Sequence, residues 1–90
     1  MIKTISIVVT GKVQGVYYRQ SAKEKARDLK ITGEVRNMPD NTVYIIATGT
    51  DEQLNQFIEW CKIGPPRAMV TGVSSTNITF QNFEKFNIVR

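Results

Sequence analysis

The sequence predicts an α+β fold in which strand, helix and strand follow one another twice. Three observations lead to this order. Residues of alternating polarity mark the strands, apolar residues at helical spacing mark two helices, and turns rich in glycine, proline or asparagine separate them. A chain of 90 residues is long enough to bury one core, and no linker or repeat interrupts it. We therefore expect a single domain over residues 1–90.

The first strand and helix follow from two different periodicities. Apolar residues at every second position predict a half-buried strand over residues 3–10. A stripe of small and apolar residues at helical spacing predicts a helix over residues 20–30, with Ser21 or a neighbour as its N-cap. The segment between them runs from Gly11 to Arg19 and is expected to form a loop.

A β-hairpin is predicted next, because residues 32–38 and 42–49 are rich in strand-forming side chains. Between them lies the turn Pro39-Asp40-Asn41, in which proline presets φ and asparagine tolerates the left-handed region. On the first strand of this hairpin, Val35 and Asn37 share one face.

The second half of the chain adds a helix and the last strands. Asp51 is the predicted cap of a helix that continues to about Lys62, and Gly64-Pro65-Pro66 ends it. Residues 69–78 and 83–89 supply the remaining strands. The apolar stripe of this helix consists of Leu54, Phe57, Ile58 and Cys61. The whole order predicts a ferredoxin-like βαββαβ sandwich, a largely antiparallel sheet of four to five strands with two helices on one face.

The amino-acid composition limits the kinds of catalytic and metal sites that the chain can form. The chain has no histidine and one cysteine, so the commonest proton shuttle is missing and no zinc-type or calcium-type spacing exists. Cys61 lies on an apolar stripe and is expected to be a core thiol. The net charge of +4 favours anionic partners. The cysteine usage, together with the absence of a signal-like or membrane-length apolar run, predicts a cytoplasmic protein without a membrane partner. We expect a monomer, because nothing in the sequence indicates an obligate interface.

Topology brings two polar segments together. The first two strands of a split β-α-β unit run in the same direction, so the loop that ends in Arg19 should face Asn37 at one edge of the sheet. The loop also enters a helix N-terminus, which attracts anions, and glycines let its amides converge. Simpler roles exist for each residue alone: Gly11 and Gly15 as turn residues, Arg19 as a solvated cation, and Asn37 in the hairpin turn. Tyr17 and Tyr18 are expected to be packing residues.

Three segments carry a resemblance to a known family. Residues 11–19, GKVQGVYYR, resemble the G-x-V-Q-G-V-x-F/Y-R signature of acylphosphatases. Residues 33–37, GEVRN, followed by Asp40, resemble the second motif of that family, G-W-V-x-N-x-x-D-G. Residues 64–70, GPPRAMV, resemble its G-P-P-x-A-x-V segment. The likeness extends over essentially the whole chain.

The resemblance implies an enzyme that hydrolyses the carboxyl-phosphate bond of a small-molecule acyl phosphate to a carboxylate and inorganic phosphate, without metal or cofactor. By position in the motifs, Arg19 and the amides of the loop would bind the phosphate, and Asn37 would orient the attacking water. The implied phosphate-binding loop consists of Gln14, Gly15, Val16, Tyr17, Tyr18 and Arg19. Phosphoryl transfer chiefly needs charge neutralisation and in-line positioning, which a chain without histidine can supply.

The sequence departs from the family pattern at a few positions. Glu34 stands in place of tryptophan, Asn41 in place of the turn glycine, and Lys30-Ile31 in place of a common Gly-Leu. We expect Asn41 to adopt the left-handed conformation that the turn requires. The Glu34 position lies on the strand face opposite Asn37, so its change affects packing or substrate contacts rather than the position of the water.

Two other function classes fit parts of the sequence. A basic ferredoxin-like sheet can bind RNA, but such sheets need exposed aromatic residues on their central strands. Tyr44 is the only aromatic residue in the first three predicted strands, so no nucleic-acid partner is expected. A regulatory sensor would keep the anion loop without turnover, and an assay of hydrolysis separates it from an enzyme.

Overall fold

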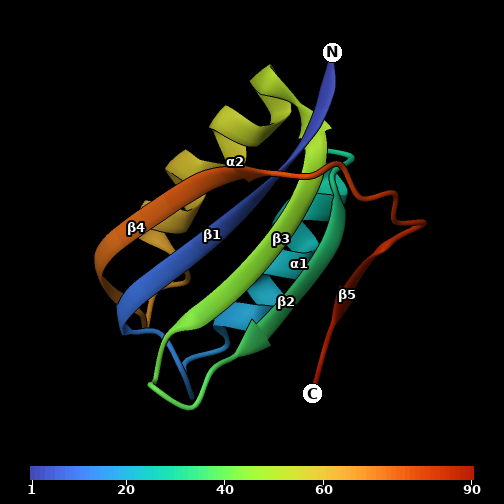
Figure 1. The fold of residues 1–90 in the computed structure, drawn as a ribbon. Helices are drawn as coiled ribbons and strands as arrows, with labels where there is room; N and C mark the ends of the chain where they lie inside the picture. Colours follow the sequence, from blue (N-terminus) through green and yellow to red (C-terminus); the bar gives the residue numbers. More distant parts are fainter.

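The computed structural model describes residues 1–90 as five strands and two helices in the predicted order (Figure 1). The elements are β1 (Ile2–Lys12), α1 (Tyr18–Asp28), β2 (Thr32–Asn37), β3 (Val43–Thr50), α2 (Asp51–Ile63), β4 (Met69–Ile78) and β5 (Phe86–Ile88). Both helices cover one face of a single five-stranded sheet, which confirms the ferredoxin-like prediction. The last strand is shorter than predicted, because only three residues of the range 83–89 form it.

The directions of the strands bring the carboxyl ends of three strands together at one end of the sheet. The strand order in the sheet is β4-β1-β3-β2-β5. β3 pairs antiparallel with both β1 and β2, so β1 and β2 run in the same direction. β5 runs parallel to β2. The carboxyl ends of β1, β2 and β5 therefore lie at the same end of the sheet, next to the N-terminus of α1 (Figure 1).

The core lies between the sheet and the helices. Alternate residues of β1 and β3 point toward the helices, and small residues of α1 allow that helix to approach the sheet closely. The side chains that fill this layer belong to one cluster of 17 buried residues, which includes Ile7, Val9, Ala22, Val35, Ile45 and Phe57. Burial of this apolar surface is the main contribution to stability. Neither helix is both long and apolar enough to span a membrane.

The helix ends differ from the sequence prediction in an instructive way. Thr50, not Asp51, is the N-cap of α2, and it forms a capping box with Gln53. The Gln53 main-chain N–H donates to the Thr50 hydroxyl over 3.2 Å, and the Thr50 N–H donates to the Gln53 side chain over 2.8 Å. Asp51 is the first helical residue and pairs with Lys3 at 2.8 Å. The prediction was wrong by one residue, because threonine and aspartate are both good N-cap residues.

The close approach of the two hairpin strands requires glycine at one position. Gly33 adopts a φ of 148° in β2, and a Cβ there would collide with the carbonyl group of Ile46 on the neighbouring strand. Only glycine lets the two strands approach this closely. This residue therefore sets the geometry of the hairpin whose far end carries Asn37.

Candidate active site

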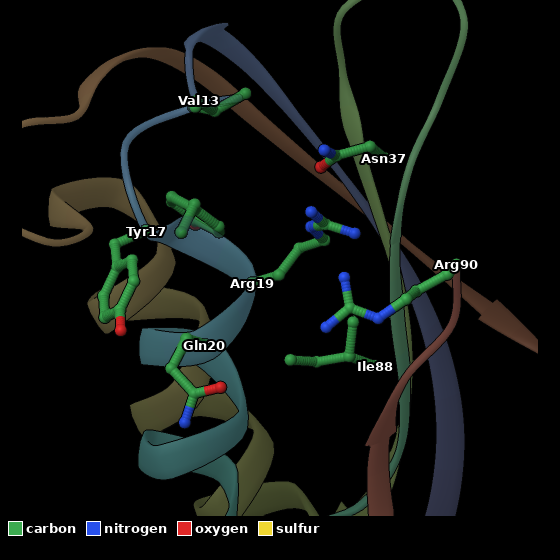
Figure 2. Close-up of a pocket in the computed structure, with 9 residues that line it drawn as sticks. Val13, Tyr17, Arg19, Gln20, Asn37, Ile88 and Arg90 are labelled. Atoms are coloured by element: carbon green, nitrogen blue, oxygen red, sulfur yellow. The ribbon is translucent and has the colours of Figure 1, made fainter.

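A pocket of about 430 Å³ lies where the N-terminus of α1 faces the ends of β2 and β5 (Figure 2). Its lining consists of Val13, Gly15, Tyr17, Tyr18, Arg19, Gln20, Asn37, Ile88 and Arg90. The two polar residues that the sequence placed at one sheet edge, Arg19 and Asn37, both line it. No aspartate or glutamate does, so the side chains of the pocket carry only positive charge.

The helix that borders the pocket begins without a side-chain cap. Its N-cap residue is Tyr17, in the left-handed conformation with φ 71°, and no acidic residue lies in the first turn. Ser21 is therefore not the cap that the sequence suggested: it lies inside the helix, and its N–H donates to the Tyr17 carbonyl oxygen over 3.1 Å. None of the main-chain N–H groups of residues 14 to 20 donates to a main-chain acceptor. Such a run of free donors at a helix N-terminus favours an anion.

The shape of the loop comes from two residues with positive φ. Gly15 has φ 72° and Tyr17 has φ 71°, and between them Val16 is buried in the core. Nothing lies within 4 Å of the position that a Cβ would take on Gly15, so the left-handed backbone, not crowding, is what favours glycine there. The loop thus curves around its own amides while one side chain anchors it.

Gln14 ties this loop to the β2–β3 turn. Its side-chain amide donates to the carbonyl oxygens of Met38 at 2.9 Å and Thr42 at 2.8 Å. The turn is shaped in its own right, because the Thr42 hydroxyl and N–H both donate to the Asp40 carboxylate, at 2.6 and 3.1 Å. These bonds hold the pKa of Asp40 below its ordinary value. The predicted loop residue Gln14 therefore joins the two segments of the site through its side chain.

Asn37 carries an unsatisfied polar atom. Its Oδ1 is buried and has no hydrogen-bond partner. Buried polar atoms in proteins are nearly always paired, and leaving one unpaired costs about 1–3 kcal/mol. Figure 2 shows the Asn37 amide directed toward the guanidinium of Arg19. Asn37 also lines the pocket, so its side chain carries an acceptor that no group of the protein satisfies.

Arg19 is also unpartnered. It is half-buried, and the three ion pairs of the molecule lie elsewhere, at Lys3–Asp51, Arg36–Glu34 and Lys62–Glu59. Its guanidinium lies in the middle of the pocket (Figure 2). A planar fork of donors without a carboxylate partner suits phosphate oxygens.

A second arginine enters the pocket and was missed from the sequence. Arg90 follows β5, and its guanidinium points toward that of Arg19 (Figure 2). The parallel register aligns Ile88 with Val35, so two residues further along Arg90 comes level with Asn37 on the same face. This pairing could have located Arg90, but nothing in the local sequence indicates that β5 lies beside β2.

Comparison with known proteins agrees with these features. A model of the family described as "Acylphosphatase" matches residues 5–88. This match includes the loop, the hairpin and almost all of the pocket. The chain belongs to the acylphosphatase family.

Individual acylphosphatases match the chain along most of its length. The acylphosphatase of Methylococcus capsulatus is 41% identical over 90 residues, covering 99% of this chain and 98% of its own. That of Marinobacter nauticus is 49% identical over 81 residues, covering 89% and 88%. The crystal structure of acylphosphatase from Bacillus subtilis superimposes with a TM-score of 0.95 at 35% identity and 100% coverage of both chains. These relatives place the chain among the hydrolases, as an acylphosphatase enzyme.

The two tyrosines of the acylphosphatase signature have opposite environments. Tyr18 is buried and donates its hydroxyl to the Cys61 carbonyl oxygen over 2.8 Å, beside the ring of Trp60. Tyr17 is 76% exposed, so the prediction that both are packing residues is wrong for Tyr17. Burial raises the pKa of Tyr18 above its ordinary value and that of the Cys61 thiol to about 12. Cys61 is thus a protonated core thiol, as predicted.

The departures from the acylphosphatase pattern are accommodated by the backbone. Asn41 adopts φ 74° in the hairpin turn, as expected of asparagine, and Lys30 adopts φ 62° where the pattern has glycine. Glu34 forms an ion pair with Arg36 at 2.7 Å on the other face of β2 from Asn37. None of these residues lines the pocket.

Proposed function

We propose that the chain hydrolyses the carboxyl-phosphate bond of acyl phosphates without a metal ion. In this proposal Arg19 and the amides of residues 14 to 19 hold the phosphoryl group, and Asn37 orients the attacking water. The observation that carries it is the coincidence, in one pocket, of free main-chain donors, an unpaired guanidinium and the orphaned Oδ1 of Asn37.

The loop amides and Arg19 complement the negative charge of the phosphoryl group. The phosphoryl oxygens would accept hydrogen bonds from the loop amides, where the helix dipole adds a partial positive charge. Arg19 supplies a full charge and two parallel donors. Donors that are already fixed in place need no reorganisation as charge shifts in the transition state, and this preorganisation is the main source of rate enhancement in such sites.

The Asn37 oxygen supports the role of orienting water. A water molecule in the pocket would donate a hydrogen bond to Oδ1. This hydrogen bond would turn a lone pair of the water oxygen toward the phosphorus. The water oxygen then bonds to phosphorus while the bond from phosphorus to the acyl oxygen breaks. The carboxylate leaves with the bonding electrons, and the water proton passes to a phosphoryl oxygen. A carboxylate is a good leaving group, so the pocket needs no acidic side chain to protonate it.

The proposal assigns no step to a metal ion. Positive charge at the phosphoryl group comes instead from Arg19 and the amide dipoles. Hydrolysis should accordingly continue in excess EDTA.

Two variants separate binding from turnover. Benzoyl phosphate is the probe substrate and inorganic phosphate the competitive inhibitor. Arg19→Lys should weaken inhibition by phosphate and lower kcat/KM by about 100-fold, because a point charge lacks the planar fork. Asn37→Ala should lower kcat by about 100-fold or more while phosphate inhibition stays within about twofold.

Matched controls come from exposed residues far from the pocket. Arg27→Gln and Asn55→Ala change the same kinds of side chain and should leave kinetics unchanged. Failure of the folded wild-type protein to hydrolyse benzoyl phosphate would overturn the proposal, and phosphate binding without turnover would instead identify a sensor. Full activity of Asn37→Ala would remove Asn37 from the mechanism.

A further inference from the structure

A second cation in the pocket has no structural partner. Arg90 is exposed, forms none of the three ion pairs of the molecule, and has no side-chain hydrogen bond that would hold it against the protein. Its guanidinium nevertheless points into the pocket and toward Arg19 (Figure 2). Two like charges that face one another without an intervening carboxylate do not stabilise the fold, so the position of Arg90 favours a role toward a ligand.

The placement of Arg90 follows from the sheet. The Val89 N–H donates to the Val35 carbonyl oxygen over 2.9 Å, which continues the parallel pairing of β5 with β2 past Ile88. Arg90 follows this bond directly, and continuation of the same register brings it level with Asn37 on the same face. The sheet thus holds the main chain up to the residue before Arg90.

The order of the three polar groups has a chemical meaning. In Figure 2 the guanidinium of Arg19 lies between the Asn37 amide and the guanidinium of Arg90. An in-line displacement requires the attacking and leaving oxygens to lie on opposite sides of the phosphorus. If the phosphoryl group is held at Arg19 and the water at Asn37, the leaving oxygen is directed toward Arg90.

We infer that Arg90 is a further catalytic residue, which binds the carboxylate of the leaving acyl group as the phosphorus–oxygen bond breaks. This inference rests on the proposed function. The electron pair of the broken bond moves onto the carboxylate oxygens, and the Arg90 guanidinium donates hydrogen bonds to them. The water proton still goes to a phosphoryl oxygen, so Arg90 gains and loses no proton. It stabilises charge that is larger in the transition state than in the bound substrate.

The test is a series of substituted benzoyl phosphates whose parent acids differ in acidity but not in shape around the carboxyl group. Arg90→Gln should lower kcat/KM by about tenfold for the least acidic leaving group and by about twofold for the most acidic. The plot of log kcat/KM against leaving-group pKa should thus become steeper. Inhibition by inorganic phosphate, which has no acyl group, should stay within about twofold of wild type. Arg90→Lys should recover part of the loss, because it keeps the charge.

The outcomes distinguish this inference from the function on which it rests. Arg27→Gln removes the same charge from the far end of α1 and should leave the slope unchanged. An equal loss for every leaving group, a parallel weakening of phosphate inhibition, or no effect of Arg90→Gln would each overturn the role of Arg90. Those results would leave the proposed function standing wherever wild type and Asn37→Ala behave as described above. Absence of hydrolysis by the wild-type protein would overturn both.

Discussion

At the scale of one residue, Asn37 lowers the stability of the fold while it provides a polar group at the candidate site. Its Oδ1 is buried without a partner, although the same side chain contributes nothing to the hairpin through that atom. An unpaired buried acceptor destabilises the folded state, and such groups concentrate where function needs them. The proposed function explains this atom as a ligand-binding group of the pocket.

An apolar replacement of Asn37 is expected to abolish activity without lowering the stability of the fold. Asn37→Leu replaces the amide with an apolar group of similar size, so the fold loses the cost of the orphaned oxygen. We expect the free energy of unfolding to stay level or to rise by up to about 1 kcal/mol, while hydrolysis is lost. Urea denaturation at neutral pH, alongside the benzoyl phosphate assay, measures both. A loss of about 2 kcal/mol or more would show that the Asn37 amide supports the fold instead.

At the scale of elements, the N-terminus of α1 matters most because nothing in the chain occupies it. Most helices satisfy their first N–H groups with a capping side chain, as α2 does through Thr50 and Gln53. In α1 the residue at that position is Tyr17, which is exposed and left-handed and provides no cap. The contrast between the two helices within one molecule supports the proposal that an anion binds the free donors of α1.

A charged and a neutral substitution at Tyr17 test this assignment. Asparagine and aspartate have nearly the same shape, and both tolerate the left-handed conformation better than tyrosine. Tyr17→Asp should be well folded, because a carboxylate suits a helix N-terminus, but it should weaken phosphate inhibition by about tenfold or more. Tyr17→Asn should retain inhibition close to that of wild type. Equal inhibition of the two variants would mean that the anion does not bind at this helix end.

At the scale of the whole molecule, the alkaline pH dependence of stability is expected from two buried acids, of which Tyr18 also lines the pocket. No histidine, aspartate or glutamate lines the pocket, whereas Tyr18 and Cys61 are buried acids whose pKa values are raised by burial. Below about pH 9 the Cys61 thiol is protonated in both the folded and the unfolded chain. As the pH rises from about 9 toward about 12, the unfolded chain loses a proton that the folded chain retains, so stability falls.

The predicted result is an alkaline loss of stability that Cys61 accounts for in part. The free energy of unfolding of the wild-type protein should decline more between pH 8 and pH 10.5 than that of Cys61→Ala. The cavity created by Cys61→Ala lowers stability at every pH and therefore does not alter the difference. Parallel curves for the two proteins would show that the thiol ionises equally in the folded and unfolded states.

The fold was largely predictable because its signals are local. The alternation of Ile5, Ile7 and Val9 and the stripe of α2 report burial directly. The meeting of Arg19 with Asn37 also followed, because the direction of the first two strands fixes it. Local pattern could not reveal Arg90, whose position depends on the three-residue strand β5 and its non-local parallel pairing with β2. Nor could it reveal the left-handed turn at Tyr17, which displaced the predicted cap Ser21.

Water held at Asn37 is proposed to attack phosphorus, and hydrolysis in water enriched in oxygen-18 tests this step most directly. Benzoyl phosphate is hydrolysed by the wild-type protein in the presence of EDTA, and mass spectrometry locates the label in the products. Attack at phosphorus places one labelled oxygen in inorganic phosphate and none in benzoate, which is the result we predict. Label in benzoate would show attack at the acyl carbon and would contradict the roles proposed for Arg19, the loop and Asn37.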